Sequence, residues 1–388
     1  MNRIAIFLLT VGVFLTATSE LVVSGILPVI AKDMDISIAL AGQLITAFSL
    51  AFAIGTPIVV GLTSRMGRKQ VLAGALMVFV LGSLLAFVSS HFWLLMVSRV
   101  ILGISAGVYL VVAFGAVAKL VPAEKIGSSI GTVILGFSTA MVLGVPIGIV
   151  ITDWLNWSAI FMILALLSFG VMLVIIRHFP EVEGDAPIPI AQQVKVLGSM
   201  VVVSGLFLTF FRESGNSAMF TYMTPFLQTI YQLNAATIGL VMLGFGLFGV
   251  IGSRLGGYVV DKWGAARMIV AGSAAHVVAL GLLPLMTASL GGGLALIALM
   301  VFAMFATAPA IQTYFIQQAP KSANLILSLN ISIVHVGLAA GAGMGGVMIN
   351  ATSTPLYNPW LAGGVIALGL GAALVSFSRT AQTASKAV

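Results

Sequence analysis

The stretch GLTSRMGRK, residues 61–69, follows one long apolar run, and the stretch GYVVDKWGA, residues 257–265, follows another. Aligning Gly67 with Gly264 gives an offset of 197 residues, which is close to half of the 388-residue chain. The same offset aligns the later motif LGVPIG with AGAGMGG. The sequence therefore predicts two copies of one structural unit, joined end to end.

The composition places both copies in a membrane. Hydrophobic residues make up 60% of the chain, charged residues only 7%, and the mean hydropathy is +1.18. A soluble domain carries about a quarter charged residues, whereas apolar runs of about 20 residues can cross a bilayer as helices. The absence of cysteine excludes disulfides, thiolate metal sites and a cysteine nucleophile.

Hydropathy predicts twelve transmembrane helices, six in each half. The first apolar run is too long for a signal peptide, so we expect it to remain in the protein as a helix. The predicted domains are an N-terminal bundle at 1–177, a cytoplasmic linker at 178–197, and a C-terminal bundle with a short cytoplasmic tail at 198–388. The predicted spans are 4–30, 39–62, 70–89, 93–117, 127–151, 158–177, 198–226, 235–259, 266–287, 290–316, 323–349 and 359–378.

The orientation follows from the basic residues. If the N-terminus is cytoplasmic, 14 of the 17 Lys and Arg residues lie on the cytoplasmic side. Of the other three, Lys32 lies in an outer loop, and Arg99 and Arg212 lie inside spans. Cytoplasmic loops carry such an excess of Lys and Arg. We therefore expect both termini in the cytoplasm, and we interpret the net charge of +7 as membrane topology rather than nucleic-acid binding.

The motifs resemble those of the major facilitator superfamily over essentially the whole chain. Residues 61–69 are similar to the signature G-x-L-A-D-R-x-G-R-K-x-x-L, with Ser64 where an acid is expected. SRVILGISAG, residues 98–107, is similar to the span-4 motif R-x-x-x-G-x-x-x-G, and GFSTAMVLGVPIG, residues 136–148, is similar to the antiporter motif of span 5. Residues 26–57 look most like the twelve-span drug:proton antiporters, in the branch of bacterial sugar-efflux and purine-efflux permeases.

This resemblance implies two pseudo-symmetric six-helix bundles and a set of gating residues. It implies a latch between the halves at Arg65, Gly67, Arg68, Asp261 and Gly264. It implies a moving helix interface at Gly144, Pro146 and Gly148. Topology alone also explains a basic loop, and close helix packing alone also explains the glycines.

Four charged residues lie well inside predicted spans, away from their cytoplasmic ends, namely Glu20, Arg99, Arg212 and Glu213. A charge at a lipid-facing helix centre costs about 2.5–3.5 kcal/mol or more, so these residues are expected to face the protein interior. Glu20 and Glu213 are candidates for proton coupling, as is Arg99 through the resemblance. The alternatives are permanent ion pairs for the glutamates and hydrogen bonds to helix carbonyls for Arg99.

The seventh span contains FLTFFRESGNSAMF, residues 207–220. Adjacent helical residues point about 100° apart, so Arg212 and Glu213 are not expected to pair with each other, although a static network of Arg212 with Glu20 or with Glu213 is an open alternative. Glu213 shares a face with Asn216 and Phe220, which predicts the wall of a central cavity opposite Glu20. The predicted substrate-cavity residues are Arg212, Asn216, Phe220, Tyr222, Asn330 and His335.

Together these features predict a proton-coupled secondary transporter that exports a small organic compound, of the drug, sugar or nucleobase class, by alternating access. The alternatives are an uptake symporter or facilitator of the same fold and, less favoured, a transporter-like sensor. No phosphate-binding loop or metalloprotease motif occurs, so we expect no enzyme, no metal and no cofactor besides the proton gradient. The expected partners are substrate, protons and lipid, but no nucleic acid, for a monomer in the bacterial cytoplasmic membrane.

Overall fold

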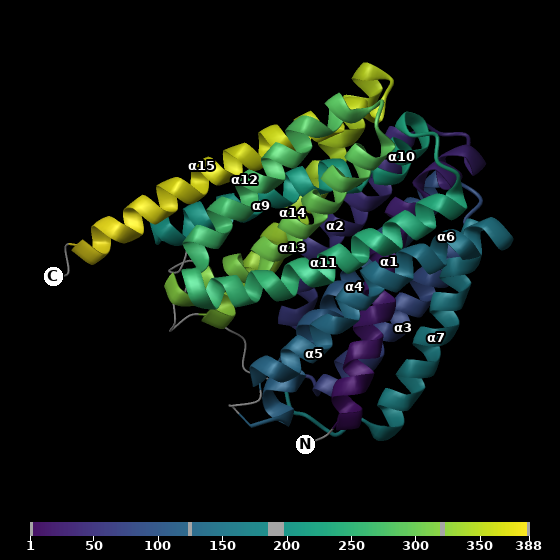
Figure 1. The fold of residues 1–388 in the computed structure, drawn as a ribbon. Coiled ribbons are helices and arrows are strands. Elements are labelled where there is room, and N and C mark those ends of the chain that lie inside the picture. The colour runs from purple at the N-terminus through teal and green to yellow at the C-terminus, as the bar shows by residue number, and fades with distance from the viewer. Residues whose placement is uncertain (1–2, 123–125, 185–197, 319–322, 386–388) are drawn as a thin grey trace. The chain divides into compact units, whose positions relative to one another are not determined.

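The computed structural model describes residues 3–122, 126–184, 198–318 and 323–385, which form helices and the turns between them (Figure 1). The chain divides into two compact units. The first unit contains Met1–Pro187 and Asn234–Leu243, and the second contains Ile188–Leu233 and Gly244–Val388. Part of the predicted linker, residues 185–197, lies outside the described residues.

The helices of the first unit follow the predicted spans closely. The fifth span consists of two α-helices joined by a π-turn at Ala140–Gly144. The helices are α1 (Arg3–Asp33), α2 (Ile38–Leu62), α3 (Arg68–Phe87), α4 (Phe92–Leu120), α5 (Ile126–Thr139), α6 (Val145–Trp154) and α7 (Trp157–His178).

The second unit repeats this arrangement. Its first predicted span is also divided, into α9 and the short α10. The helices are α9 (Met200–Phe220), α10 (Met223–Ile230), α11 (Ala235–Trp263), α12 (Ala265–Leu282), α13 (Leu290–Gln318), α14 (Ala323–Thr352) and α15 (Asn358–Ser385), and α11 begins in the segment that groups with the first unit.

Eleven helices among the described residues are long and apolar enough to cross a membrane. The helix α9 is not one of the eleven, because Arg212, Glu213 and Asn216 lower its hydropathy. These polar residues are nevertheless held inside the second unit, as described below. The prediction of an all-helical membrane protein is thus confirmed, and the cytoplasmic placement of the two termini stays a prediction.

A proline follows each of the two interruptions. Pro146 has no N–H to continue the ladder of the fifth span, and the N–H of Val145 just before it bonds the Ala140 carbonyl in a π-type turn. In the seventh span the helix ends at Phe220, and Pro225 lies in the first turn of the next helix. The prediction of one continuous helix over 198–226 was wrong here.

The same helix pairs pack in both units, as the repeat predicts. In the first unit α1 packs against α5, and α3 packs against both α4 and α7. In the second unit α9 packs against α14, and α12 packs against both α13 and α15. Gly264 forms the turn between α11 and α12 with a φ of +86°, a conformation that favours glycine. Its repeat partner Gly67 has a φ of −58°, so the two loops are not conformationally equivalent.

Candidate functional site

Each unit has a buried arginine in the middle of a transmembrane helix and a glutamate that interacts with it. In the first unit Arg99 on α4 is fully buried. Its Nη1 donates to the Ser19 carbonyl at 2.9 Å and its Nε to the Leu44 carbonyl at 3.3 Å. The guanidinium also lies 4.4 Å from the centre of the Phe48 ring and interacts electrostatically with Glu20. Arg99 thus joins α4 to α1 and α2.

The span-4 motif forms one face of α4. Arg99, Gly103 and Gly107 follow one another at intervals of one helical turn. A Cβ at Gly103 would overlap the carbonyl oxygen of Phe48, and a Cβ at Gly107 would overlap the hydroxyl of Thr56. The two glycines therefore bring α4 close enough to α2 for Arg99 to reach a backbone carbonyl of that helix. The hydrogen bonds to helix carbonyls that the sequence left open are present.

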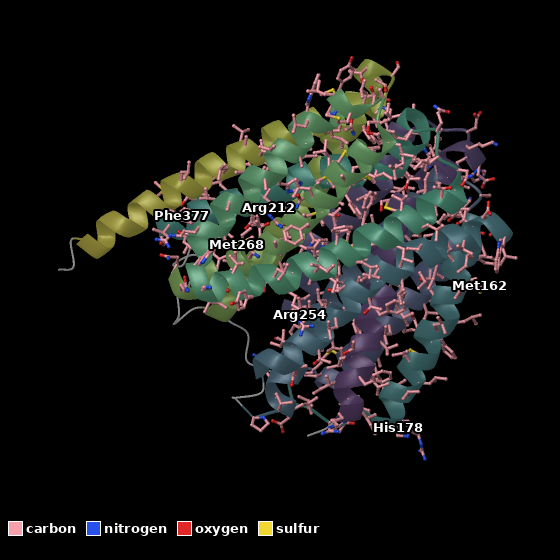
Figure 2. All side chains as sticks on the ribbon, in the orientation of Figure 1. Met162, His178, Arg212, Arg254, Met268 and Phe377 are labelled. Atoms are coloured by element: carbon pink, nitrogen blue, oxygen red, sulfur yellow. The ribbon has the colours of Figure 1, made fainter. Side chains whose placement is uncertain are left out.

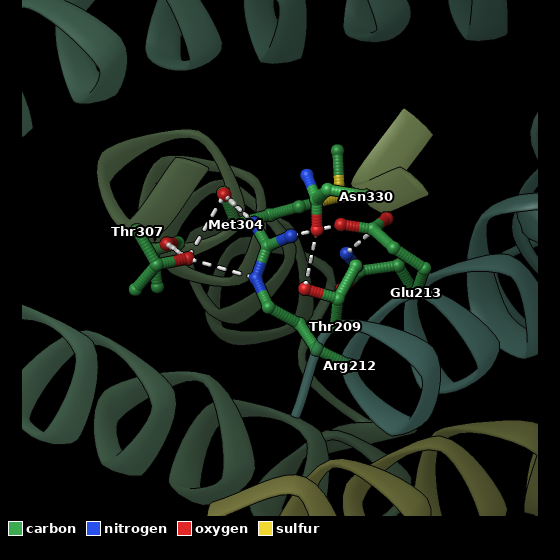
Figure 3. Close-up of polar contacts among 8 residues, drawn as sticks. Thr209, Arg212, Glu213, Met304, Thr307 and Asn330 are labelled. Atoms are coloured by element: carbon green, nitrogen blue, oxygen red, sulfur yellow. Dashed lines mark hydrogen bonds and ion pairs between the residues drawn. The ribbon is translucent and has the colours of Figure 1, made fainter. Parts of the chain in front are cut away.

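In the second unit Arg212 on α9 is the centre of a polar cluster (Figures 2 and 3). Its Nε donates to the Thr307 hydroxyl of α13 at 3.0 Å, and its Nη2 donates to the Met304 carbonyl. Its Nη1 forms an ion pair with Glu213. The Asn216 amide donates to the other carboxylate oxygen of Glu213 at 3.0 Å. Every terminal group of this arginine therefore has a partner.

The expectation that Arg212 and Glu213 do not pair was wrong. Their Cα–Cβ bonds diverge as expected for adjacent helical residues, but both side chains are long enough to turn toward each other. The predicted contact of Glu213 with Asn216, three residues further along, is confirmed. The static pair that the sequence left as an alternative is thus formed inside the second unit, with side-chain exposures of 5% for Arg212 and 14% for Glu213.

The other predicted cavity residues have different surroundings. Asn330 on α14 accepts a hydrogen bond from Thr209 at 2.8 Å and so extends the polar region of α9. His335 is buried and its Nδ1 lies 3.0 Å from the Ile331 carbonyl of its own helix. Phe220, at the end of α9, is half-buried.

Tyr222 is a packing residue in this structure. Its side chain is fully buried, and its hydroxyl donates to the Ala342 carbonyl of α14 at 2.8 Å. Its ring lies against Gly345, where a Cβ would come within 2.6 Å of it. The turn after α9 thus directs the ring into the contact between helices, and a place for Tyr222 in a substrate cavity stays a prediction.

The predicted gating residues of the fifth span pack against α1. A Cβ at Gly144 would approach the Thr18 hydroxyl to 2.6 Å, and one at Gly148 would overlap Val22. Pro146, between them, is half-buried and begins α6 just after the π-turn. The glycines therefore allow close packing of this kinked span on α1, and their role in gating stays a prediction.

The loop after α2 contacts the chain that follows α7 in the same unit. The Arg68 N–H donates to the Val182 carbonyl at 2.7 Å, and Lys69 pairs with Glu181 at 3.0 Å. Lys119, at the end of α4, donates to the carbonyls of Glu183 and Gly184, at 2.9 and 3.0 Å. A carboxylate for the basic loop, which Ser64 does not supply, thus comes from Glu181.

These contacts do not test the predicted latch between the halves. The side chain of Arg65 is exposed, whereas that of Arg68 is buried against Gly115 of α4. The backbone of Asp261 belongs to α11, but its side chain lies outside the described residues. A latch that involves Asp261 remains a prediction.

Sequence reasoning missed three members of the polar cluster, which are Thr209, Met304 and Thr307. Thr307 is a polar residue within the apolar stretch FAMFATAPA, two residues before Pro309, and this position was its only signal. His276 of α12 is also buried, interacts electrostatically with Arg212, and its Nε2 has no hydrogen-bond partner among the described residues.

The structure has two repeated bundles of membrane-spanning helices, and each contains a buried arginine that interacts with a glutamate. These features define a polytopic membrane protein of the secondary-transporter class. The model of the Major Facilitator Superfamily matches residues 9–342 and, in a second match, residues 204–387, and the chain belongs to this family. It is therefore a multi-pass membrane transporter, and the predicted major facilitator fold is confirmed.

Known members of the family resemble the chain over nearly its whole length. The uncharacterised MFS-type transporter YbcL of Bacillus subtilis (strain 168) is 37% identical, over 99% of this chain and 98% of that protein. A probable sugar efflux transporter of Helicobacter pylori (strain P12) is 26% identical, over 89% of this chain and 88% of that protein. The crystal structure of a D-xylose–proton symporter matches with a TM-score of 0.77 at 17% identity, covering 97% of each chain, and supports the fold.

Proposed function

We propose that this transporter exports a small organic compound, of the drug, sugar or nucleobase class, in exchange for protons, and that Glu213 carries the proton. The observation that carries the proposal is the cluster of Arg212, Glu213 and Asn216 within a transmembrane helix. Ionisable residues at such positions are expensive to bury and usually serve transport or proton relay. The proton gradient supplies the energy, so no further cofactor is required.

Asn216 fits both protonation states of Glu213. Its Nδ2 donates to the carboxylate at 3.0 Å, as suits the ionised form. Its Oδ1 is buried without a hydrogen-bond partner among the described residues. Rotation of the amide by half a turn would present that oxygen to a protonated carboxyl group, which has one O–H to donate. The pair can therefore exchange one good hydrogen bond for another when Glu213 binds a proton.

Arg212 has anchors that do not depend on Glu213. Its Nε and Nη2 are held by Thr307 and the Met304 carbonyl, both on α13. Protonation of Glu213 would therefore remove the negative charge beside a guanidinium that stays in place. The net charge of the cluster changes from zero to positive, which alters its affinity for any substrate that contacts Asn216 or Glu213. Proton binding and substrate binding would then exclude each other.

Glu20 and Arg99 form the second candidate for proton coupling, in the first unit. Arg99 is anchored on two backbone carbonyls in a similar way. Export is supported by the partial antiporter motif at Gly144 and Pro146 and by the likeness to a probable sugar efflux transporter. The Lys and Arg distribution supports a bacterial cytoplasmic membrane with both termini inside.

The test compares Glu213→Gln and Glu20→Gln with the wild type in proteoliposomes. Substrate uptake is measured with and without an imposed pH gradient. We expect Glu213→Gln to lose the response to the gradient and to keep substrate exchange between the two sides. Full proton-driven transport by both variants would overturn the proposal. Uptake into right-side-out vesicles driven inward by the proton gradient would instead support a symporter.

The substrate can be found by a binding screen. A compound that binds the folded protein raises its apparent stability by RT ln(1 + [L]/Kd), which is about 2.7 kcal/mol at 100 times the Kd. A thermal-shift screen of the purified protein with sugars, nucleobases, nucleosides and common antimicrobials would therefore separate the substrate classes. We expect one class to stabilise the wild type, and a stabilisation lost in Asn216→Ala would place the substrate at the cluster.

A further inference from the structure

Three glycines of α14 follow one another at intervals of one helical turn, and each faces a backbone carbonyl of α9. A Cβ at any of the three would lie within 2.8 Å of that carbonyl oxygen, closer than real Cβ atoms come. The pairs are Gly337 with Phe210, Gly341 with Ser214, and Gly345 with Ala218. Glycine thus lets the backbone of α14 pack directly on the backbone of α9 over about two turns.

Side chains add hydrogen bonds across the same interface. The Ser217 hydroxyl of α9 donates to the Leu338 carbonyl of α14 at 2.7 Å. One turn further along α14, the Ala342 carbonyl accepts a hydrogen bond from the Tyr222 hydroxyl at 2.8 Å. Each bond joins a side chain on one side of the interface to the backbone on the other, so neither helix can slide without breaking it.

Asn358, the first residue of α15, joins the two helices near the end of α9. Its side chain is fully buried. Its Nδ2 donates to the Ala218 carbonyl of α9 at 3.0 Å and to the Gly345 carbonyl of α14 at 3.4 Å. The N–H of Tyr222 bonds the Met219 carbonyl at the break after α9. Asn358 thus supplies a donor to a carbonyl at this break and holds α9 against α14.

The polar cluster around Arg212 lies on this helix pair (Figure 3). A Cβ at Gly337 would lie 2.9 Å from the Cβ of Glu213. Thr209, one turn before Glu213 on α9, donates to Asn330 of α14 at 2.8 Å. The packing of α9 on α14 therefore also sets the positions of the cluster residues that these two helices carry.

The equivalent pair of the first unit, α1 with the fifth span, begins in the same way. A Cβ at Gly136 of α5 would overlap the Thr10 carbonyl of α1. The Thr10 hydroxyl donates to the Thr132 carbonyl of α5 at 3.2 Å. Before the π-turn at Ala140–Gly144, backbone therefore packs on backbone here as well.

After the π-turn, side chains of α1 make the contact. A Cβ at Gly144 would lie 2.6 Å from the hydroxyl of Thr18 and 2.9 Å from its methyl group, whereas its repeat partner Gly341 meets a carbonyl oxygen. The Thr18 hydroxyl donates to the Phe14 carbonyl at 2.7 Å. This hydrogen bond survives a shift of α6 along α1, because both of its partners belong to α1.

We propose that α9 and α14 act as one rigid element that carries the Arg212 cluster, whereas α6 can shift against α1 when the transporter changes conformation. A backbone carbonyl moves only with its helix, but a side chain can turn to another rotamer. The π-turn, a feature often found at functional sites, separates the two kinds of contact in the fifth span. The two halves of the repeat therefore have different mechanical roles, whichever side chain carries the proton.

The experiment compares Gly341→Ala with Gly144→Ala, at two positions related by the repeat offset of 197 residues. Hydrogen–deuterium exchange of the purified full-length protein in lipid nanodiscs, read by mass spectrometry, reports the local opening of each helix. We expect Gly341→Ala to speed exchange in both α9 and α14 by about 10-fold, because its methyl group overlaps the Ser214 carbonyl. Gly144→Ala should speed exchange in α1 and α6 by less than about 2-fold, since it meets a side chain in an interface that can shift. The higher helix propensity of alanine is common to both variants.

Ser217→Ala tests the hydrogen bonds without adding an atom. It loses the bond to the Leu338 carbonyl and should speed exchange in both α9 and α14 by about 2- to 10-fold, as expected for one hydrogen bond. The matched control is Thr18→Val, which loses a hydrogen bond within α1 and should leave exchange in α6 unchanged.

Unchanged exchange in α9 and α14, or faster exchange confined to one of them, would overturn the proposal, as would equal effects of Gly341→Ala and Gly144→Ala. Thermal unfolding shows whether each variant is folded at the temperature of the exchange. If Gly341→Ala is not folded, Ser217→Ala and Thr18→Val decide between the outcomes. The readout needs no substrate, so its result stands whatever transport by Glu213→Gln shows.

Discussion

Arg99 offers a sharp test of the structure of the first unit, through two substitutions that separate its charge from its shape. Arg99→Lys keeps the positive charge near Glu20 but has no planar fork to serve two carbonyls. Arg99→Met keeps most of the apolar stem and removes the charge. The structure predicts that both variants are destabilised and that the methionine variant is destabilised more.

The magnitudes follow from the contacts. Arg99 donates to the carbonyls of Ser19 and Leu44, at 2.9 and 3.3 Å. Lysine can keep one of them, so Arg99→Lys should cost about 1.5–3 kcal/mol, the value of one charged hydrogen bond. Arg99→Met loses both and leaves the buried Glu20 without its cation, which costs about 3–5 kcal/mol. Phe48, 4.4 Å from the guanidinium, contributes about 0.5–2 kcal/mol of this through its ring face.

The assay is unfolding by denaturant in detergent micelles, followed by the fluorescence of the five tryptophans. The double variant Glu20→Gln/Arg99→Met completes a thermodynamic cycle. We expect it to be less destabilised than the sum of the two single variants, because removal of both charges leaves no unpaired carboxylate. Strict additivity, or equal stability of Arg99→Lys and Arg99→Met, would refute the reasoning.

Three further predictions concern other parts of the chain. Tyr222→Phe removes the hydrogen bond to the Ala342 carbonyl and should lower the free energy of unfolding by about 1 kcal/mol, measured in the same assay. Substrate affinity should stay the same, and a large loss of affinity would instead indicate that Tyr222 lines the substrate cavity. Glu181→Gln removes an ion pair whose carboxylate side chain is 77% exposed, so the unfolding free energy should change by less than about 1 kcal/mol and the change should shrink in high salt. Since the chain has no cysteine, Leu155→Cys should react with an impermeant maleimide in intact cells and Met66→Cys only in opened ones, and the reverse pattern would invert the predicted topology.

The transmembrane helices could be predicted because lipid imposes one strong rule. Each apolar run long enough to cross the bilayer became helical, since a helix satisfies its own backbone hydrogen bonds. The predicted repeat also appears in the helix packing, since α1 packs against α5 in the first unit and α9 packs against α14 in the second. Charges inside spans were expected to face the interior because their cost in lipid is large whatever the fold, and Glu20, Arg99 and Arg212 are buried whereas Glu213 is half-buried.

The partners of those charges could not be predicted in the same way. Helical geometry predicted that Arg212 and Glu213 would not pair, but both side chains are long enough to reach each other. Thr307 and Met304 contact Arg212 from a helix about 90 residues further along the chain, so no local pattern reports them. The break between Phe220 and Met223 was also missed, because the pattern of apolar residues continues through it.

The central claim is that proton binding at Glu213 and substrate binding exclude each other. The most direct measurement is the number of protons released when a substrate found in the binding screen is added to purified protein in weakly buffered solution, followed with a pH indicator dye. Measured over a series of pH values, the account predicts that the wild type releases protons on binding and that Glu213→Gln binds the substrate without releasing any. Equal proton release by the two proteins, or none by the wild type, would contradict it.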